Sequence, residues 1–236
     1  MNEQEKLKVH SIFESISGEA GGFPQGTWVT FIRLQGCNLR CSWCDTKGSQ
    51  EADHPAKMMT PDEIFDQIQT RDVLITGGEP LYQAKQLIPL IAKLLQNGRK
   101  VQIETNGSLK FPNQLIPVFY HGGGPIHWVV DYKCPSSGMS DAMPPLEHFF
   151  AWIRQAFWRD KIYLKWVIAD DQDLEFALGK IEMIIPHTPP IYHLISPIDG
   201  KGEMIQDMVA KIRKRDPNLL NHITFSVQLH KLINMP

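Results

Sequence analysis

The sequence predicts an α/β protein in which a mostly parallel sheet forms a partial or modified (β/α) barrel of the TIM-like kind. Short apolar, β-branched segments alternate with amphipathic helical segments along the 236 residues, which favours strands joined by crossover helices. Polar and glycine-rich loops directly follow several of the strand segments, as they do at the carboxyl edge of parallel sheets. The length is near the lower end for barrel enzymes, and we expect residues 1–236 to form one domain.

Each expected strand has a local signal. β-Branched and aromatic residues, bounded by glycine, proline or polar turns, indicate a strand. By this criterion we expect eight strands. The ranges that contain them, several of which include the loop after the strand, are 7–13, 27–34, 72–80, 100–107, 127–138, 161–170, 190–200 and 222–230.

The helices are predicted by apolar periodicity and by their ends. Thr60 is suited to the N-cap of a helix, with Pro61 at its first position and Glu63 three residues after the cap. Gly98 is expected to stop a second helix. The expected helices span residues 60–68, 84–98, 146–158, 171–185 and 203–215.

Composition excludes several classes of protein. The formal net charge is −2, so no basic surface suggests nucleic-acid binding. No apolar run approaches the ~20 residues of a membrane span, and the first ten residues lack the apolar core of a signal peptide. We therefore expect a cytoplasmic protein without a membrane partner, whose cysteines stay reduced.

Three of the four cysteines lie within one short loop, at Cys37, Cys41 and Cys44. This spacing brings three sulfur atoms to one side of a loop. Three thiolates can bind three irons of a four-iron cluster and leave the fourth iron open. Two other interpretations remain at this point: a zinc site whose fourth ligand is Cys134 or a histidine, and three unrelated buried cysteines.

The C-x3-C-x2-C spacing, with Trp43 before the last cysteine, resembles the signature of radical S-adenosylmethionine enzymes. The resemblance implies a 4Fe-4S cluster on Cys37, Cys41 and Cys44, and S-adenosylmethionine on the open iron. In that family the reduced cluster cleaves the cofactor and yields a 5′-deoxyadenosyl radical that abstracts hydrogen. Cys134 is then expected to be a buried or loop thiol and not a ligand.

Loops after later strands fit the same resemblance. Backbone atoms of glycines in the segment TGGEP can approach a ligand closely, and the family uses this motif to hold the amino end of the cofactor. A turn is the simplest interpretation of each loop when it is taken alone. The residues that the resemblance assigns to the cofactor are Trp43, Asp45, Gly78, Glu79, Glu104, Asn106, Asp131, Lys133, Ser136, Ser196, Pro197, Ile198 and Asp199.

Segments near both ends of the chain, together with the loops above, indicate which family of radical S-adenosylmethionine enzymes the sequence resembles. IFESISGEA (12–20), FIRLQGCNLRCSWCDT (31–46), ITGGEP, IETNG and SVQLHKLINMP (226–236) together resemble the 7-carboxy-7-deazaguanine synthase family. That family converts 6-carboxy-5,6,7,8-tetrahydropterin to 7-carboxy-7-deazaguanine with loss of ammonia, as a carbon–nitrogen lyase of queuosine and deazapurine biosynthesis. The resemblance also implies Mg²⁺, a flavodoxin- or ferredoxin-type electron donor, and a homodimer.

The same resemblance suggests substrate residues with a physical rationale. Arg33 can pair bidentately with the substrate carboxylate, and Glu19 can accept from the donor edge of a pterin. Thr46 is expected to bind Mg²⁺ through its hydroxyl. In the family the carboxylate of a terminal proline reaches the substrate, so an extension after Pro236 is expected to harm activity. The N-terminal segment and the C-terminal tail are expected to close the substrate site, whose residues are Ile16, Ser17, Gly18, Glu19, Arg33, Thr76, His230 and Pro236.

The sequence departs from the family pattern at three places. Ser17 stands where the family has glutamine, so the polar side chain at this position is shorter. Ala20 stands where it has glycine, so the turn cannot depend on glycine there. DYKCPSSG, residues 131–138, stands where many relatives have Ser-Pro-Lys, which leaves the cofactor contacts of Asp131 open.

Two other functions are compatible with parts of the pattern. An activating enzyme of a glycyl-radical protein uses the same cysteine spacing, but its substrate is a protein and it needs no arginine for a small carboxylate. A non-catalytic iron–sulfur or zinc module needs neither cofactor loops nor substrate residues. Anaerobic reconstitution and a pterin-binding assay distinguish these alternatives.

Overall fold

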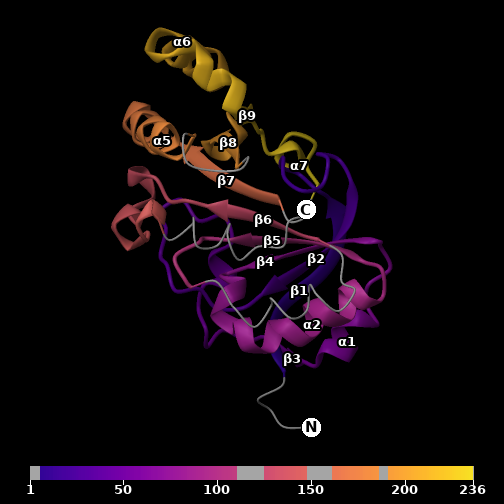
Figure 1. Ribbon diagram of the computed structural model, residues 1–236. Coiled ribbons are helices and arrows are strands. Elements are labelled where there is room, and N and C mark those ends of the chain that lie inside the picture. Colours follow the sequence, from indigo (N-terminus) through magenta and orange to yellow (C-terminus); the bar gives the residue numbers. More distant parts are fainter. Residues whose placement is uncertain (1–5, 111–124, 148–160, 186–190, 236) are drawn as a thin grey trace.

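The computed structural model describes residues 6–110, 125–147, 161–185 and 191–235. In this part of the chain one sheet of nine strands has the order β3-β1-β2-β4-β5-β6-β7-β8-β9. The strands are stacked in this order from β3 at the bottom of Figure 1 towards β9 at its top. The two edge strands do not pair with each other, so the sheet is open and forms a partial barrel.

The parallel sheet predicted from the sequence is confirmed from β2 to β9. Every neighbouring pair in this range is parallel. The strands are β1 (Leu7–Ile16), β2 (Trp28–Leu34), β3 (Lys57–Met59), β4 (Asp72–Gly77), β5 (Lys100–Thr105), β6 (Ile126–Asp131), β7 (Lys161–Ile168), β8 (Tyr192–Pro197) and β9 (Ile223–Phe225).

The first strands correct the expectation in two ways. β1 pairs with β2 and β3 in antiparallel fashion, so the sheet carries an antiparallel edge that alternation of strands and helices did not predict. β1 also continues to Ile16, past the expected end at residue 13, because Ile16 still pairs with Trp28. Residues 17–27 therefore form the connection of a long hairpin between β1 and β2.

The helices are α1 (Pro61–Phe65), α2 (Ala84–Gln96), α5 (Asp171–Ile184), α6 (Met204–Arg215) and α7 (Leu229–Leu232). α1 begins with a capping box, in which Thr60 accepts from the Glu63 N–H and the Glu63 carboxylate accepts from the Thr60 N–H. Gly98 adopts φ +71° after α2, as the predicted stop requires. The expected helix 146–158 lies largely outside the described residues.

The C-terminal segment also differs from expectation. The last strand was expected over residues 222–230, but β9 covers only Ile223–Phe225 and α7 follows it. The chain leaves the sheet because Ser226 and Leu229 bond to other segments: the Ser226 hydroxyl accepts from the Ala20 N–H, and the Leu229 N–H donates to Gly18 O. This turn carries residues 226–230 across the end of the sheet towards the N-terminal loop (Figure 1).

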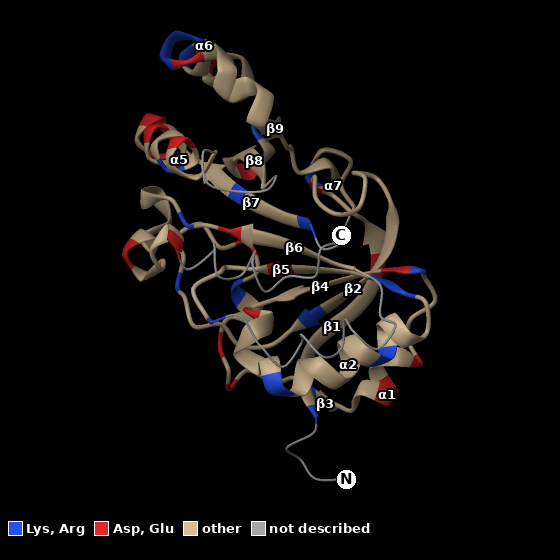
Figure 2. Ribbon diagram, in the orientation of Figure 1, with Lys and Arg blue, Asp and Glu red and all other residues tan. Residues whose placement is uncertain are grey.

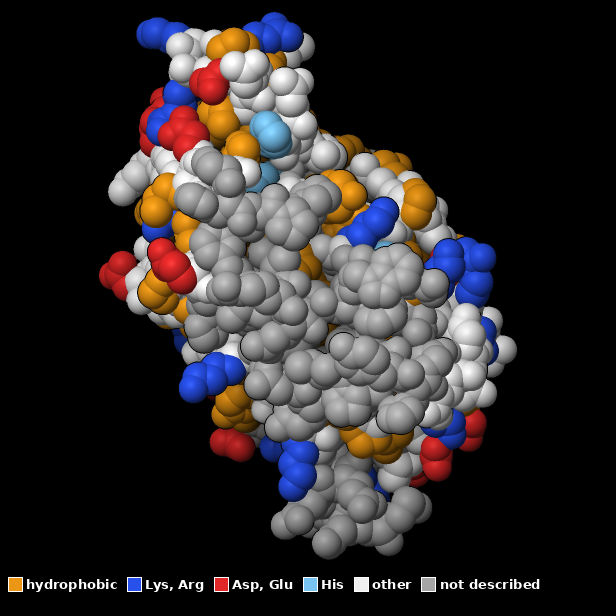
Figure 3. Space-filling view, in the orientation of Figure 1, with side chains coloured by type: hydrophobic (Ala, Val, Ile, Leu, Met, Phe, Trp, Pro, Cys, Tyr) orange, Lys and Arg blue, Asp and Glu red, His pale blue; other side chains and the backbone are white. Residues whose placement is uncertain are grey.

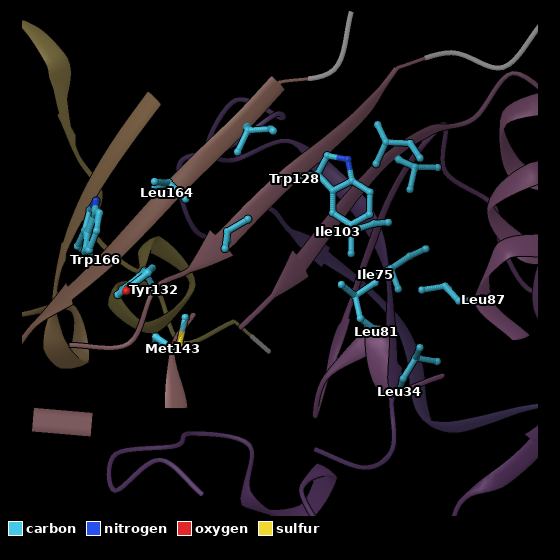
Figure 4. Packing of buried hydrophobic residues seen from close by; sticks show 14 of the residues in the cluster. Leu34, Ile75, Leu81, Leu87, Ile103, Trp128, Tyr132, Met143, Leu164 and Trp166 are labelled. Atoms are coloured by element: carbon cyan, nitrogen blue, oxygen red, sulfur yellow. The ribbon is translucent and has the colours of Figure 1, made fainter. Parts of the chain in front are cut away.

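Alternation along each strand separates two faces of the sheet. On β4, Val73 and Ile75 belong to the main hydrophobic core, whereas Leu74 and Thr76 point to the other face. The helices α2 and α5 cover the core face with buried leucine and isoleucine side chains. Figure 4 shows this packing around Trp128 and Trp166, both fully buried. The opposite, inner face is left to line a pocket.

Charged groups lie mainly at the surface of the described residues. The ribbon of Figure 2 is coloured for lysine and arginine at one end of α6, and Figure 3 shows basic side chains in the same region; the last turn of α6 holds Arg213, Lys214 and Arg215. Arg215 is paired with Glu175 and Glu182 of α5. Among the described helices, none has both the length and the apolar character needed to cross a membrane.

Candidate active site

A pocket opens on the inner face of the sheet at the carboxyl ends of the parallel strands. Strands β2 and β4 to β8, the cysteine loop and the C-terminal segment all contribute to its wall. The residues expected to form the site that do line it are Gly18, Glu19, Arg33, Cys37, Cys41, Trp43, Cys44, Asp45, Thr46, Thr76, Gly78, Glu104, Asn106, Asp131, Lys133, Ser196, Pro197, Ile198, Asp199 and His230.

Four of the expected site residues that the structure describes do not line the pocket, namely Ile16, Ser17, Glu79 and Ser136. Ile16 ends β1, and Ser17 is buried with its N–H donating to Thr27 O. Glu79 is completely buried behind the pocket wall. Ser136 lies behind the cysteine loop, and Pro236 lies outside the described residues.

The cysteine loop is held by bonds to two other segments. The Cys37 N–H donates to Gln50 O at 2.9 Å. On the other side the Ser42 hydroxyl donates to Ser136 O at 2.7 Å, and Trp43 Nε1 donates to Ser136 Oγ at 3.1 Å. Ser136 therefore supports the loop that presents the thiols, in place of a direct contact with the pocket.

The three thiols of the cysteine loop face the same pocket. All three line the pocket, yet no three histidine, cysteine or acidic side chains of the described ranges converge on one point as a single metal ion requires. A four-iron cluster takes one thiolate per iron, so its ligands lie apart. Burial raises the pKa of the Cys37 and Cys41 thiols, and the nearby Lys133 opposes this shift.

Cys134 is separated from the other cysteines. It is fully buried within the main core, and burial raises the pKa of its thiol well above the usual value. It does not line the pocket. A buried neutral thiol of this kind behaves as a small apolar side chain.

The loop after β4 depends on glycine for its path against the cysteine loop. The Gly78 N–H donates to Leu34 O at 3.0 Å, and the Glu79 N–H donates to Gly36 O at 2.8 Å. A Cβ on Gly78 would lie 2.2 Å from Gly36 O. Only a residue without a side chain fits, and the backbone of Gly77 and Gly78 therefore reaches the pocket.

Replacing Gly78 by alanine is expected to destabilise the protein by about 1–3 kcal/mol, because backbone must move to admit the methyl group. Gly179, inside α5, is a matched control, since nothing lies within 4 Å of a Cβ there. Gly179→Ala is expected to stabilise the helix by about 0.5–1 kcal/mol. Urea unfolding of both variants measures the difference, and equal effects would contradict the close approach at Gly78.

Glu79 connects the loops behind the pocket. Its Oε1 accepts from the Leu81 N–H at 2.8 Å and from the Thr105 hydroxyl at 2.7 Å, and its Oε2 accepts from the Asn106 N–H at 2.7 Å. Burial raises the pKa of this carboxyl, although these donors oppose the shift. In this arrangement Glu79 orders Asn106 and the ends of two strands, and backbone of the neighbouring glycines faces the pocket.

Several side chains of the pocket wall offer acceptors and donors to a polar ligand. Asn106 is almost completely buried, and its Nδ2 donates to Asn38 Oδ1 at 3.1 Å. Ser196 is held by a bond from its hydroxyl to Ser226 O. Asp199 is exposed and adopts φ +53°, a left-handed conformation that asparagine and aspartate tolerate better than most residues. An outlier of this kind is often found at a ligand site.

The pocket wall also contains an arginine. Arg33 lies on β2 with its guanidinium 5.2 Å from the centre of the Phe13 ring, and Phe13 stacks on Phe31 with the rings 5.0 Å apart. Burial lowers the pKa of Arg33, while Asp45 and Glu104 oppose the shift. Arg33 Nε is buried and has no hydrogen-bond partner among the described residues. A buried donor left open in this way is ready for a ligand oxygen.

Glu104, on β5, has an unusual acidity. Burial and then the neighbouring Glu19 raise its pKa from 4.5 to about 7. Thr76 and Gln102 hydrogen-bond its side chain, and Lys165 opposes the shift. Near neutral pH this group is therefore partly protonated, and it can donate a hydrogen bond as well as accept one.

The stability of the metal-free protein is expected to depend on Glu104. Because its pKa is higher in the folded state, folding binds a proton between about pH 4.5 and 7, and this contribution is lost as the pH rises. Glutamine does not titrate, so Glu104→Gln is not expected to lose this stability. The free energy of unfolding of Glu104→Gln, minus that of the wild type, is therefore expected to be up to about 3 kcal/mol larger at pH 8 than at pH 5. Urea unfolding at both pH values measures this gain; a pH-independent difference would contradict it.

The N-terminal loop and the C-terminal segment meet over the pocket. Gln25 Nε2 donates to Gly18 O at 2.8 Å and to Val227 O at 2.6 Å. A Cβ on Gly18 would lie 1.9 Å from His230 Nδ1, so glycine allows His230 to approach this loop. Burial lowers the pKa of His230. Ala20, the departure from the family glycine, has no positive φ and packs beside Val129, Tyr163 and Leu194.

Sequence reasoning missed several residues of the pocket wall. The most important is Lys165, a lysine on the inner face of the buried strand β7, which forms an ion pair with Glu19. A polar residue within the apolar segment KIYLKWVI was its only signal in the sequence. The other missed residues of the wall are Phe13, Phe31, Leu39, Gln50, Leu74, Gly77, Thr105, Val129, Val167, Gln228 and Lys231.

Comparisons with known proteins show which family the chain is similar to. The family model of the Radical SAM superfamily matches residues 31–116. The chain is 35% identical over 237 residues to 7-carboxy-7-deazaguanine synthase of Clostridium acetobutylicum, covering 97% of this chain and 96% of that protein. It is 34% identical over 232 residues to the protein of that name from Methanospirillum hungatei, covering 98% and 86%.

Two solved structures share the fold. QueE from Escherichia coli aligns with a TM-score of 0.65 and 22% identity over 94% of each chain. SuiB of Streptococcus suis, bound to the precursor peptide SuiA, aligns with a TM-score of 0.56 and 13% identity over 84% of this chain and 48% of its own. At these identities the likeness concerns the fold alone.

Proposed function

The chain belongs to the 7-carboxy-7-deazaguanine synthase family of radical S-adenosylmethionine proteins, and from this premise we propose that it converts 6-carboxy-5,6,7,8-tetrahydropterin to 7-carboxy-7-deazaguanine with loss of ammonia. One observation carries the proposal: three cysteines and a half-buried arginine, whose Nε is buried and has no partner among the described residues, line the same pocket. A glycyl-radical activating enzyme would not need that arginine, because its substrate is a protein.

Cys37, Cys41 and Cys44 would hold the 4Fe-4S cluster. When bound, the cluster and S-adenosylmethionine supply a radical that abstracts hydrogen from the substrate. The backbone of Gly77 and Gly78 offers acceptors for an ammonium group, and Asn106, Ser196 and Asp199 offer polar contacts elsewhere on the pocket wall. Trp43 packs under the Lys133 ammonium, 4.8 Å from the ring centre, and so orders the wall beside the thiols.

The remaining wall suits a flat ring with a carboxylate. Arg33 would bind the carboxylate, and the stacked rings of Phe13 and Phe31 provide an apolar surface beside it. Glu19 would accept from the amino edge of the pterin. Thr76 and Glu104 lie on adjacent strands between Arg33 and Glu19. His230 and the loop at Gly18 cover the pocket and limit access of water to the reacting ring.

Further parts of the proposal rest on the family resemblance. Thr46 lines the pocket beside Asp45, and its hydroxyl would be one ligand of Mg²⁺. The carboxylate of Pro236 would contact the substrate from the tail. A flavodoxin- or ferredoxin-type donor would reduce the cluster, and the enzyme would act in the cytoplasm as a homodimer.

The proposed function is tested by the dependence of cofactor cleavage on the pterin. The protein is reconstituted anaerobically with iron and sulfide, reduced with dithionite, and supplied with S-adenosylmethionine and Mg²⁺. Formation of 5′-deoxyadenosine is expected to increase when 6-carboxytetrahydropterin is added. Cleavage that is indifferent to the pterin would contradict the proposed substrate and favour a protein substrate.

A further inference from the structure

Lys165 occupies a position where a buried strand ordinarily carries an apolar side chain. It lies on the inner face of β7 between Tyr163 and Val167, with its side chain 14% exposed at the pocket wall. Asp131 of β6 and Leu194 of β8 lie beside it in register. Burying an ammonium group costs free energy unless carboxylates compensate for it. The position therefore has a role beyond packing.

Glu19 is the principal partner of this lysine. Lys165 Nζ forms an ion pair with Glu19 Oε2 and lies 4.0 Å from Asp131 Oδ2. Asp131 has a closer cation, because Lys133 Nζ lies 2.9 Å from the same oxygen. Burial lowers the pKa of Lys165, but the carboxylates outweigh burial and the net shift is upward. The ammonium group therefore remains charged beside Glu19.

Glu19 is held at both of its oxygens. Lys165 binds Oε2, and Gln228 Nε2 donates to Oε1 at 2.8 Å. A carboxylate oxygen has two lone pairs, so each oxygen keeps one acceptor site free for a ligand. Glu19 is 13% exposed and lines the pocket. Held in this way, it presents two parallel acceptors to a ligand with two adjacent N–H donors.

The surroundings show what the lysine prevents. Glu104 on β5, when ionised, carries the same sign of charge as Glu19 and interacts with it electrostatically. Without the ammonium group the two carboxylates would repel each other, and Glu19 would keep only the bond from Gln228. Its side chain would then be free to rotate, and this rotation would remove the two parallel acceptors from the ligand.

We propose that Lys165 is a positioning residue that holds Glu19 against the amino-pyrimidinone edge of the substrate, and thereby selects 2-amino-4-oxo pteridines over 2,4-dioxo pteridines. The inference rests on the proposed function and adds a specificity device to it. In a pterin, the 2-amino group and N3–H are adjacent donors that match the two acceptors of Glu19. In a lumazine, a carbonyl oxygen replaces the amino group and faces the carboxylate, which is unfavourable.

The test compares two fluorescent probes, 6-carboxypterin and 6-carboxylumazine, titrated into the reconstituted full-length protein. The wild type is expected to prefer the pterin by at least about tenfold. Lys165→Met is expected to lose most of this preference by weakening pterin binding, and Lys165→Arg is expected to retain part of it. Lys161→Met is the matched control, because Lys161 lies on the same strand but is exposed and outside the pocket; it is expected to behave as the wild type.

A double substitution distinguishes positioning from a merely structural role. If Lys165 acts through Glu19, then Lys165→Met combined with Glu19→Gln is expected to bind the pterin no more weakly than Glu19→Gln alone. This double variant also avoids an unpaired buried charge if Lys165→Met folds poorly. Two results would overturn the inference while leaving the proposed function standing. One is a loss of pterin affinity in the double variant equal to the product of the two single losses. The other is a preference for pterin over lumazine in Lys165→Met that equals the preference of the wild type. A wild type that binds neither probe would reject the pterin substrate itself, and the inference with it.

Discussion

Replacing Cys37, Cys41 or Cys44 by alanine is expected to abolish the iron–sulfur cluster and all cleavage of S-adenosylmethionine. Each thiol would serve a different iron, and each lines the pocket at the end of a loop held by its backbone. No other cysteine of the described chain is placed to substitute, because Cys134 is fully buried in the core. Iron and sulfide analysis, visible absorption and 5′-deoxyadenosine formation after anaerobic reconstitution measure the loss.

Cys134→Ala is the matched control for this experiment. It removes a sulfur atom from the core and is expected to cost about 1 kcal/mol or more of stability. The cluster is expected to assemble as in the wild type, with the same iron content per chain. Loss of iron in Cys134→Ala with retention in Cys44→Ala would show that the ligands are wrongly assigned.

Arg33→Ala is expected to weaken substrate binding by about 2–5 kcal/mol while leaving the cluster intact. Arg33 is half-buried and its Nε is buried without a partner among the described residues, so its removal takes away the expected counter-ion of the substrate carboxylate. This corresponds to an increase of about 30-fold or more in the dissociation constant. Titration with 6-carboxypterin, together with the visible spectrum of the cluster, separates loss of binding from loss of the cluster.

Two further variants sharpen the result for Arg33. Arg33→Lys retains the charge but not the paired geometry, and is expected to bind with intermediate affinity. Arg213→Ala removes an arginine from the end of α6, away from the pocket, and is expected to change nothing. If Arg33→Ala bound 6-carboxypterin as tightly as the wild type, the carboxylate of the substrate would have to lie elsewhere.

The sequence was sufficient to predict the alternating sheet and most of the pocket wall. β-Branched segments and helix ends are local signals, and the loops at Thr76, Glu104 and Asp131 lie together because parallel strands end at one edge. The length of β1 and of β9 was not predictable in this way. Ile16 remains in a strand because Trp28 pairs with it, and the chain leaves β9 because of bonds to residues 18 and 20.

The roles of individual side chains required the structure. Glu79 in the segment TGGEP suggests a ligand-binding carboxylate, yet three protein donors occupy it: the nearby Leu81 N–H, and Thr105 and Asn106 from the end of β5. Lys165 gives little signal beyond a charge within an apolar strand, and only the fold shows that it forms an ion pair with Glu19 at the pocket wall. Contacts between residues far apart in the sequence decide such roles, and periodicity does not report them.

The most direct test of the account is the mass of the product formed by the reconstituted wild-type protein from 6-carboxy-5,6,7,8-tetrahydropterin. With S-adenosylmethionine, Mg²⁺ and dithionite present, mass spectrometry is expected to detect 7-carboxy-7-deazaguanine, which is absent when S-adenosylmethionine is omitted. Unchanged substrate beside an intact cluster that still cleaves S-adenosylmethionine would contradict the account, because the pocket would then serve a different substrate.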